Sequence, residues 1–306
     1  MRFALLALAV VAAAFPQEEE TAAAPAPGPV KGTPPTGGAA PVAPAGGQLA
    51  GAGAVPGTLA SGPYKSAYWA EPTLPTHTIF GPIAPPANLK MPVMIWGNGA
   101  CSGNGTYFKR SLYEVASRGF FVIANGNPTG GAGTTSALQK ASLNWIEKNA
   151  GKGKWANVDG KRIAVAGQSC GGLETYDVAT DPRVSVVGIF NSGEFGTPSK
   201  STKVTKPIFY FLGGSSDIAY ANGERDYKAL PATTPKWKGN LPVGHMATWS
   251  TTNGGKFGKA EWMWLDYTLR GSKTSQAFFL GEGAKADGWV VESKNMDKYT
   301  PLPAYT

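Results

Sequence analysis

The sequence predicts an α/β fold, with a mostly parallel, doubly wound sheet, helices on both faces and no large lid. From Ser61 onward, short apolar runs alternate with segments of helical periodicity. This alternation is typical of parallel strands that are covered by helices. The chain is 42% apolar and only 16% charged, which argues against a coiled coil or a charge-rich disordered protein. Two Cys and two His exclude a Cys-rich disulfide scaffold and a zinc finger of Cys and His ligands.

The apolar runs predict the strands, several of which stop at glycine. The run at residues 92–96 ends at Gly97, and the run at residues 162–166 leads directly into Gly167. Such short runs bounded by glycine are typical of buried strands. The expected strands cover residues 76–80, 92–96, 120–124, 162–166, 184–190, 207–212 and, with a weaker pattern, 235–241.

Helical spacing predicts the segments between the strands. Phe108, Leu112 and Val115 recur at the period of a helix over residues 106–118, which ends before Gly119. A broad apolar face predicts a second helix at residues 136–149, and residues 257–270 are apolar along one side. A further helix is expected over residues 173–179.

The first 60 residues are expected to lie outside the folded domain. Arg2 is followed by about a dozen apolar residues and then small ones, which is typical of a cleaved signal peptide over residues 1–14. The alternative, a membrane anchor, requires a longer run, and no later run reaches the ~20 apolar residues of a membrane span. Residues 15–60 contain 9 Pro, 9 Gly and 12 Ala, a composition that predicts a disordered linker or pro-region. The domain is then expected over residues 61–306, in a secreted, extracellular protein.

One motif carries most of the functional prediction. Residues 167–171 read Gly-Gln-Ser-Cys-Gly, which fits G-x-S-x-G at the junction of a strand and a helix. A sharp turn at this junction would expose the hydroxyl of Ser169 at a helix N-terminus, and the flanking glycines would avoid clashes. Ser169 is therefore the candidate nucleophile. The alternative is an ordinary βα turn with an idle serine.

A nucleophilic serine needs a base and an acid that orients it. His77 lies near the start of the domain, far from where a base is expected, whereas His245 follows the last weak strand. Asp217 lies on the loop after the strand at residues 207–212 and is the candidate acid. The resulting chain order is serine, acid, histidine.

Two rivals for the acid and two donors for an oxyanion complete the candidate site. Glu224 and Asp226 follow Asp217, but helical spacing from Tyr220 places them on a solvated helix. The N–H of Cys170, directly after the nucleophile, and the N–H of Asn98, after the strand at residues 92–96, are the expected oxyanion donors. Gly99 is the next candidate for the second donor.

Together these segments resemble the α/β-hydrolase superfamily. The resemblance rests on residues 96–99 (Trp-Gly-Asn-Gly), 117–124, 167–172 and 213–217, and extends over about residues 64–280. The chain is most similar to lidless secreted esterases such as dienelactone hydrolases, cutinase-like polyester hydrolases and chlorophyllase-like proteins, fungal members above all. It departs from them at Trp96, where many members have His, and at Cys170, where Met or Gln is usual. The resemblance implies a Ser-His-Asp esterase that needs no metal and no organic cofactor.

The two cysteines lie on the proposed oxyanion loop and on the serine turn, which are neighbours in a sheet of this type. Exactly two Cys in a secreted chain favour one disulfide, Cys101–Cys170. The alternatives are two buried free thiols, or a cysteine nucleophile, although Cys170 lies one step past the turn. Asn104 begins the one N-x-[ST] sequon and is a glycosylation candidate.

These observations predict a secreted serine hydrolase that cleaves carboxylic esters, small or polymeric, and acts as a monomer. The net charge of +8 favours anionic surfaces, but no basic cluster with interleaved aromatic residues supports nucleic-acid binding. The alternative is a catalytically silent secreted protein that uses the same fold for binding or as an effector. Peptidase activity is less favoured because no propeller or cap segment accompanies the core.

Overall fold

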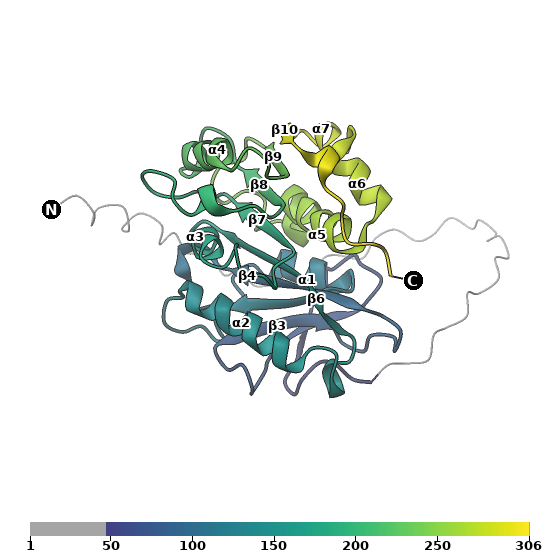
Figure 1. Ribbon diagram of the computed structural model, residues 1–306. Coiled ribbons are helices and arrows are strands. Elements are labelled where there is room, and N and C mark those ends of the chain that lie inside the picture. The colour runs from purple at the N-terminus through teal and green to yellow at the C-terminus, as the bar shows by residue number, and fades with distance from the viewer. Residues whose placement is uncertain (1–46, 306) are drawn as a thin grey trace, which may run out of the picture. The chain divides into compact units, whose positions relative to one another are not determined.

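The computed structural model describes residues 47–305, which fold into one compact unit (Figure 1). The expected signal peptide at residues 1–14 and the linker residues 15–46 lie outside the described residues. No helix of the described part is both long and apolar enough to cross a membrane.

A ten-stranded mixed sheet forms the centre of the unit, in the order β1-β2-β3-β5-β4-β6-β7-β8-β9-β10. The six strands from β5 to β9 in this order are parallel, and antiparallel strands flank them on both sides. The predicted α/β class with a mostly parallel sheet is therefore confirmed. The strands are β1 (Val55–Pro56), β2 (Ser66–Ala70), β3 (His77–Pro82), β4 (Met91–Gly97), β5 (Phe121–Asn125), β6 (Val158–Gln168), β7 (Val186–Phe190), β8 (Ile208–Leu212), β9 (Lys236–Asn240) and β10 (Val290–Lys294).

Helices cover both faces of the sheet, as its residues predict. Along the central strands, alternate side chains belong to two separate apolar clusters, because successive residues of a strand point to opposite faces. One cluster includes side chains of α1, α5 and α6, and the other includes side chains of α2, α3 and α4. The helices are α1 (Lys109–Ser117), α2 (Ser136–Asn149), α3 (Cys170–Tyr176), α4 (Tyr220–Ala229), α5 (Gly255–Arg270), α6 (Lys273–Leu280) and α7 (Gly283–Ala286).

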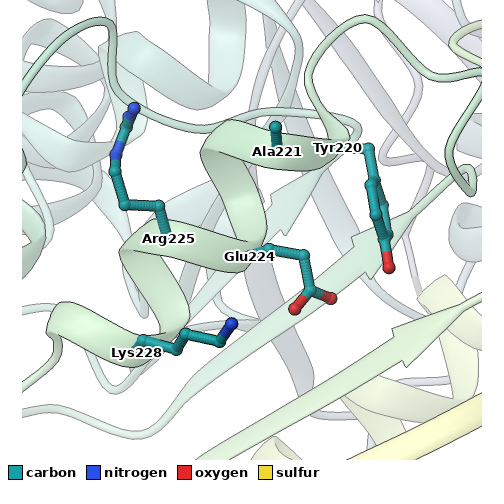
Figure 2. Close-up of a pocket in the computed structure, with 5 residues that line it drawn as sticks. All are labelled: Tyr220, Ala221, Glu224, Arg225 and Lys228. Carbon is teal, nitrogen blue, oxygen red and sulfur yellow. The ribbon is translucent and has the colours of Figure 1, made fainter.

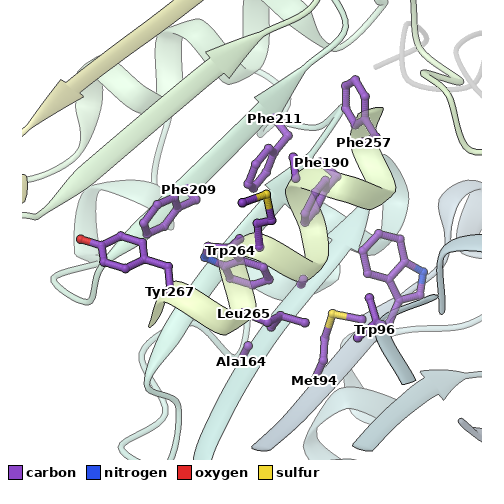
Figure 3. Packing of buried hydrophobic residues seen from close by; sticks show 14 of the residues in the cluster. Met94, Trp96, Ala164, Phe190, Phe209, Phe211, Phe257, Trp264, Leu265 and Tyr267 are labelled. Carbon is purple, nitrogen blue, oxygen red and sulfur yellow. The ribbon is translucent and has the colours of Figure 1, made fainter. Parts of the chain in front are cut away.

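The face under α5 is built largely from aromatic rings. Figure 3 shows Trp264 of α5 against rings of β7 and β8, and its ring centroid lies 6.0 Å from that of Phe190 and 6.2 Å from that of Phe209. All three side chains are fully buried. Packed aromatic pairs of this kind stabilise a fold by more than the burial of their surface alone. They therefore hold in place the strands whose ends carry the candidate site.

The expected domain boundary at residue 61 is too late. β1 pairs with β2, and the N–H groups of Leu49 and Ala50 both donate to the carbonyl of Ile83. The side chains of Leu49 and Ala50 are buried. Residues 47–60 are thus part of the folded unit. Their Gly and Ala content is typical of a linker, but a few buried apolar side chains and an edge strand are enough to anchor them.

The other differences from the predicted elements have local causes. The helix expected over residues 173–179 begins earlier, at Cys170. Gly171 and Gly172 disfavour a helix by propensity, but a Cβ at Gly171 would lie 2.0 Å from the carbonyl oxygen of Gly97. These glycines therefore serve close packing. The strands β1, β2 and β10 and the helices α6 and α7 were not predicted.

Candidate active site

The structure brings the three predicted catalytic side chains into one hydrogen-bonded chain. Ser169 Oγ lies 2.9 Å from His245 Nε2, and His245 Nδ1 lies 2.6 Å from Asp217 Oδ1. They come from the ends of β6, β8 and β9, three parallel strands whose carboxyl ends meet at one edge of the sheet. The side chain of Asp217 is fully buried, whereas that of His245 is 12% exposed. The relay therefore runs from the interior to a serine that solvent can reach.

Ser169 lies on a sharp strand-to-helix turn in a strained conformation. Its φ of 53° and ψ of −116° fall outside the regions that L residues ordinarily adopt. The turn is held by the N–H of Ser169, which donates to Phe190 O at 3.0 Å, and by Ser192 Oγ, which donates to Ser169 O at 2.7 Å. Strain that is maintained by surrounding contacts is typical of functional turns.

Asp217 accepts four hydrogen bonds, two at each oxygen. Oδ1 accepts from His245 and from the N–H of Ala219 at 2.9 Å, and Oδ2 accepts from the N–H of Gly213 at 3.1 Å and from Asn191 Nδ2 at 3.0 Å. Burial alone would raise the pKa of Asp217, but the hydrogen bonds from His245, Ala219 and Asn191 outweigh it and lower that pKa. The carboxylate is therefore ionised and accepts the proton of His245 Nδ1, which leaves Nε2 free to accept from Ser169.

The loop that carries His245 is fastened to the serine turn and to the acid loop. Gln168 Nε2 donates to the carbonyl of His245 at 3.0 Å, and the N–H of Gly244 donates to the carbonyl of Gly213 at 2.7 Å. Gly213 allows this approach, because a Cβ there would lie 2.1 Å from the carbonyl oxygen of Gly244. Sequence analysis identified no role for Gln168, the variable residue that precedes the serine.

The predicted oxyanion loop packs directly on the serine turn. A Cβ at Gly171 would lie 2.7 Å from the backbone nitrogen of Asn98. The buried side chain of Asn98 fixes this loop, since Nδ2 donates to the carbonyls of Ser102, Asn104 and Asn125 at 3.0, 3.0 and 2.7 Å. Asn98 and Cys170 thus lie on adjoining backbone segments, and their role as donors stays a prediction.

The predicted disulfide Cys101–Cys170 is present and joins the two segments covalently. Neither cysteine is free, so the alternatives with free thiols are wrong for this structure. Glu174 lies beside the sulfur atoms, and the three residues form a cluster with metal-ligating atoms within 4.8 Å of one another. The disulfide occupies both sulfurs, and Glu174 accepts from Asn125 Nδ2 and Thr134 Oγ1 at 2.8 and 2.7 Å, which gives this cluster a structural role.

The rival acid Asp226 does not join the site, and its expected solvated position was wrong. It lies on α4, is fully buried and accepts from Tyr176 Oη at 3.0 Å and from the N–H of Glu194. Burial raises its pKa. The helical spacing was interpreted correctly, but this face of α4 turns toward the sheet, where Tyr176 supplies a partner.

Glu224, His77 and Asn104 also lie apart from the triad. Glu224 forms an ion pair with Lys238 at 2.8 Å. His77 begins β3, is buried beside the carbonyl of Leu138, and has its pKa lowered by burial to about 4. Asn104 Oδ1 accepts from the N–H and the hydroxyl of Thr106, at 3.0 and 2.8 Å, and its glycosylation stays a prediction.

Asn191, directly after β7, was missed by sequence analysis. It is fully buried, and its side chain contacts Asp217, Gly244 and Trp249. The available signal was a polar residue at the end of a buried apolar strand, at the same sheet edge as the nucleophile. Side chains of neighbouring loops converge at such positions.

Two surface hollows lie elsewhere on the molecule. Figure 2 shows the larger, of about 530 Å³, beside α4, where Tyr220, Glu224, Arg225 and Lys228 line it. The second, of about 270 Å³, is lined by residues that include Lys90 and Arg270. Neither is lined by a triad residue, and the triad's chemical geometry identifies the candidate site better than the size of these hollows.

At the carboxyl edge that carries the triad, the crossover from β7 to β8, residues 191–207, contains a single 3₁₀ turn, Ser201–Lys203, and no α-helix. No protein-family model and no curated protein matches the chain.

Proposed function

We propose that the protein is a secreted serine hydrolase that cleaves carboxylic esters through a Ser-His-Asp triad. The observation that carries the proposal is the unbroken chain from Ser169 Oγ through His245 to Asp217 Oδ1, with contacts of 2.9 and 2.6 Å. A serine, a base within hydrogen-bond reach and a buried carboxylate that orients the base are the parts that nucleophilic acyl transfer needs.

In the proposed reaction, Ser169 Oγ attacks the acyl carbon as its proton passes to His245 Nε2. The N–H groups of Cys170 and Asn98 bind the oxyanion of the tetrahedral intermediate. When the intermediate collapses, His245 gives the proton to the departing alkoxide, and an acyl-serine remains. Water then attacks this ester while His245 takes its proton, and the second collapse releases the acid and restores the serine. Asp217 stabilises the imidazolium in both steps and stays ionised.

The architecture supports an α/β-hydrolase fold for this chemistry. The nucleophile lies on a strained turn between β6 and α3, and the acid and the base follow it in chain order on the loops after β8 and β9. This arrangement is that of the nucleophile elbow and triad of α/β-hydrolases. The partly exposed serine, together with a β7–β8 crossover that holds no α-helix, favours small esters or esters at the surface of a polymer.

We further propose that the protein works outside the cell. The disulfide Cys101–Cys170 supports this location because disulfides persist in oxidising compartments. The monomeric state stays a prediction.

The proposal is tested with p-nitrophenyl acetate and butyrate as substrates. We expect the protein to hydrolyse them and Ser169→Ala to lower kcat by about 10⁴- to 10⁶-fold, since triad members act as a unit. Ser293→Ala, at an exposed position on β10, is the matched control and should retain full activity. A folded protein that hydrolyses no ester, or a Ser169→Ala variant as active as the parent, would favour the silent binding protein instead.

A further inference from the structure

We propose that Asn191 is a positioning residue of the triad, which holds the Asp217 carboxylate in the orientation that presents Oδ1 to His245. This inference rests on the proposed function for its kinetic consequence but not for its structural one. Asn191 contacts no reacting atom and would act through Asp217.

The hydrogen-bond partners determine which way the Asn191 amide faces. Its Oδ1 lies 3.4 Å from Trp249 Nε1, and an indole nitrogen can only donate, so the oxygen must face Trp249. The NH₂ group therefore faces Asp217 Oδ2, at 3.0 Å, and the carbonyl of Gly244, at 3.4 Å. One buried amide thus connects the acid to the loop that carries His245.

The backbone also fits this role. Asn191 has a φ of 43°, in the left-handed region that asparagine tolerates better than most residues and that glycine adopts freely. Its N–H donates to the carbonyl of Phe211 in β8 at 2.8 Å. The residue is therefore fixed between β7 and β8, and glycine or aspartate can replace it without new backbone strain.

Removal of the amide would leave the outer oxygen of the acid underbonded. Asp217 Oδ2 accepts only from Asn191 and from the N–H of Gly213 in the described part of the chain. Without Asn191 the carboxylate can turn away from His245, and its charge loses a partner inside the protein. Among the titratable groups of the described residues, His245 is the one that hydrogen-bonds to Asp217, whereas Glu174 on α3, Glu194 after β7 and Asp226 on α4 are hydrogen-bonded to other groups.

The first experiment measures the pKa of Asp217 by carboxyl-carbon NMR in the parent protein and in Asn191→Gly. We expect a higher pKa in the variant, because a donor to the ionised form is lost. Asn295→Gly is the matched control: Asn295 also has a positive φ, of 58°, and donates through Nδ2, but to the carbonyls of Ala232 and Thr234 at the opposite edge of the sheet. An unchanged pKa in Asn191→Gly would overturn the proposal, whether or not the protein is an esterase.

The second experiment records kcat and KM for p-nitrophenyl butyrate against pH. Asn191→Gly should lower kcat about tenfold and leave KM unchanged, because a buried hydrogen bond to a charged group is lost without any contact to substrate. In the plot of kcat against pH, Asn191→Asp should show a fall at alkaline pH that the parent lacks. Two carboxyls about 3 Å apart share one proton, which serves as the missing donor until it is lost as the pH rises.

The outcomes separate this proposal from the proposed function. A parent protein without esterase activity contradicts the function, while the NMR comparison still decides the role of Asn191. An active parent whose Asn191→Gly kcat stays within twofold, or an Asn191→Asp profile with the parent's shape, contradicts the role of Asn191 alone. The Asn295→Gly and Asn295→Asp controls should match the parent in both measurements.

Discussion

Because the backbone of Ser169 is strained, we predict that the Ser169→Gly variant is more stable to unfolding than the Ser169→Ala variant. Residues in such conformations carry about 1–3 kcal/mol of strain, which glycine relieves because it has no Cβ. Glycine also gives the unfolded chain more freedom, which costs about 0.4–1 kcal/mol. Both variants lack the hydroxyl, so the comparison isolates the Cβ. We therefore expect Ser169→Gly to exceed Ser169→Ala by about 1 kcal/mol in the free energy of unfolding.

Urea-induced unfolding, monitored by tryptophan fluorescence, measures this difference. A difference of about 1 kcal/mol corresponds to a melting temperature about 2–4 °C higher for a domain of this size. The same pair of substitutions at Ser293 is the control, because at an ordinary strand position glycine should be the less stable residue. If Ser169→Ala were as stable as Ser169→Gly, or more so, the turn would not be strained and the interpretation of Ser169 as an elbow would lose its physical basis.

Two further predictions concern stability. The double variant Cys101→Ala/Cys170→Ala should unfold about 4 kcal/mol more easily in urea than the oxidised parent, because the bridge spans 69 residues; a loss below about 1 kcal/mol would contradict this. Burial raises the pKa of Glu261, on α5, to about 8 from an ordinary 4.5. Between these two pH values the folded state binds a proton that the unfolded state has lost. The free energy of unfolding should therefore fall, as the pH rises, by up to about 1.4 kcal/mol per pH unit. Glu261→Gln should abolish that decline, and a variant with the parent's pH dependence would disprove the assignment.

The sequence was sufficient where a local pattern determines a local structure. The glycines around Ser169 predicted the turn, and the apolar runs predicted the parallel strands to within a few residues. His245 and Asp217 could be chosen because only two histidines exist and because chain order limits where the acid can lie. The disulfide could be predicted because the chain has two cysteines and because they lie on loops that are expected to be neighbours.

The remaining features depend on contacts between distant segments. The sequence marks Asn191 only as a polar residue at the end of a buried strand. Its role comes from Trp249, 58 residues away, and from Asp217. Residues 47–60 have the composition of a linker, yet Leu49 lies buried on the sheet. The helical pattern around Asp226 does not reveal which face of α4 packs against the sheet. In each case tertiary packing outweighs local composition.

Covalent labelling with a fluorophosphonate probe, mapped by mass spectrometry, tests the assignment of the nucleophile most directly. The probe reacts only with a serine whose neighbours make it nucleophilic. We predict one adduct per chain, on the peptide that contains Ser169, and none on Ser169→Ala. A folded protein that remains unlabelled, or an adduct on a different residue, would contradict the assignment.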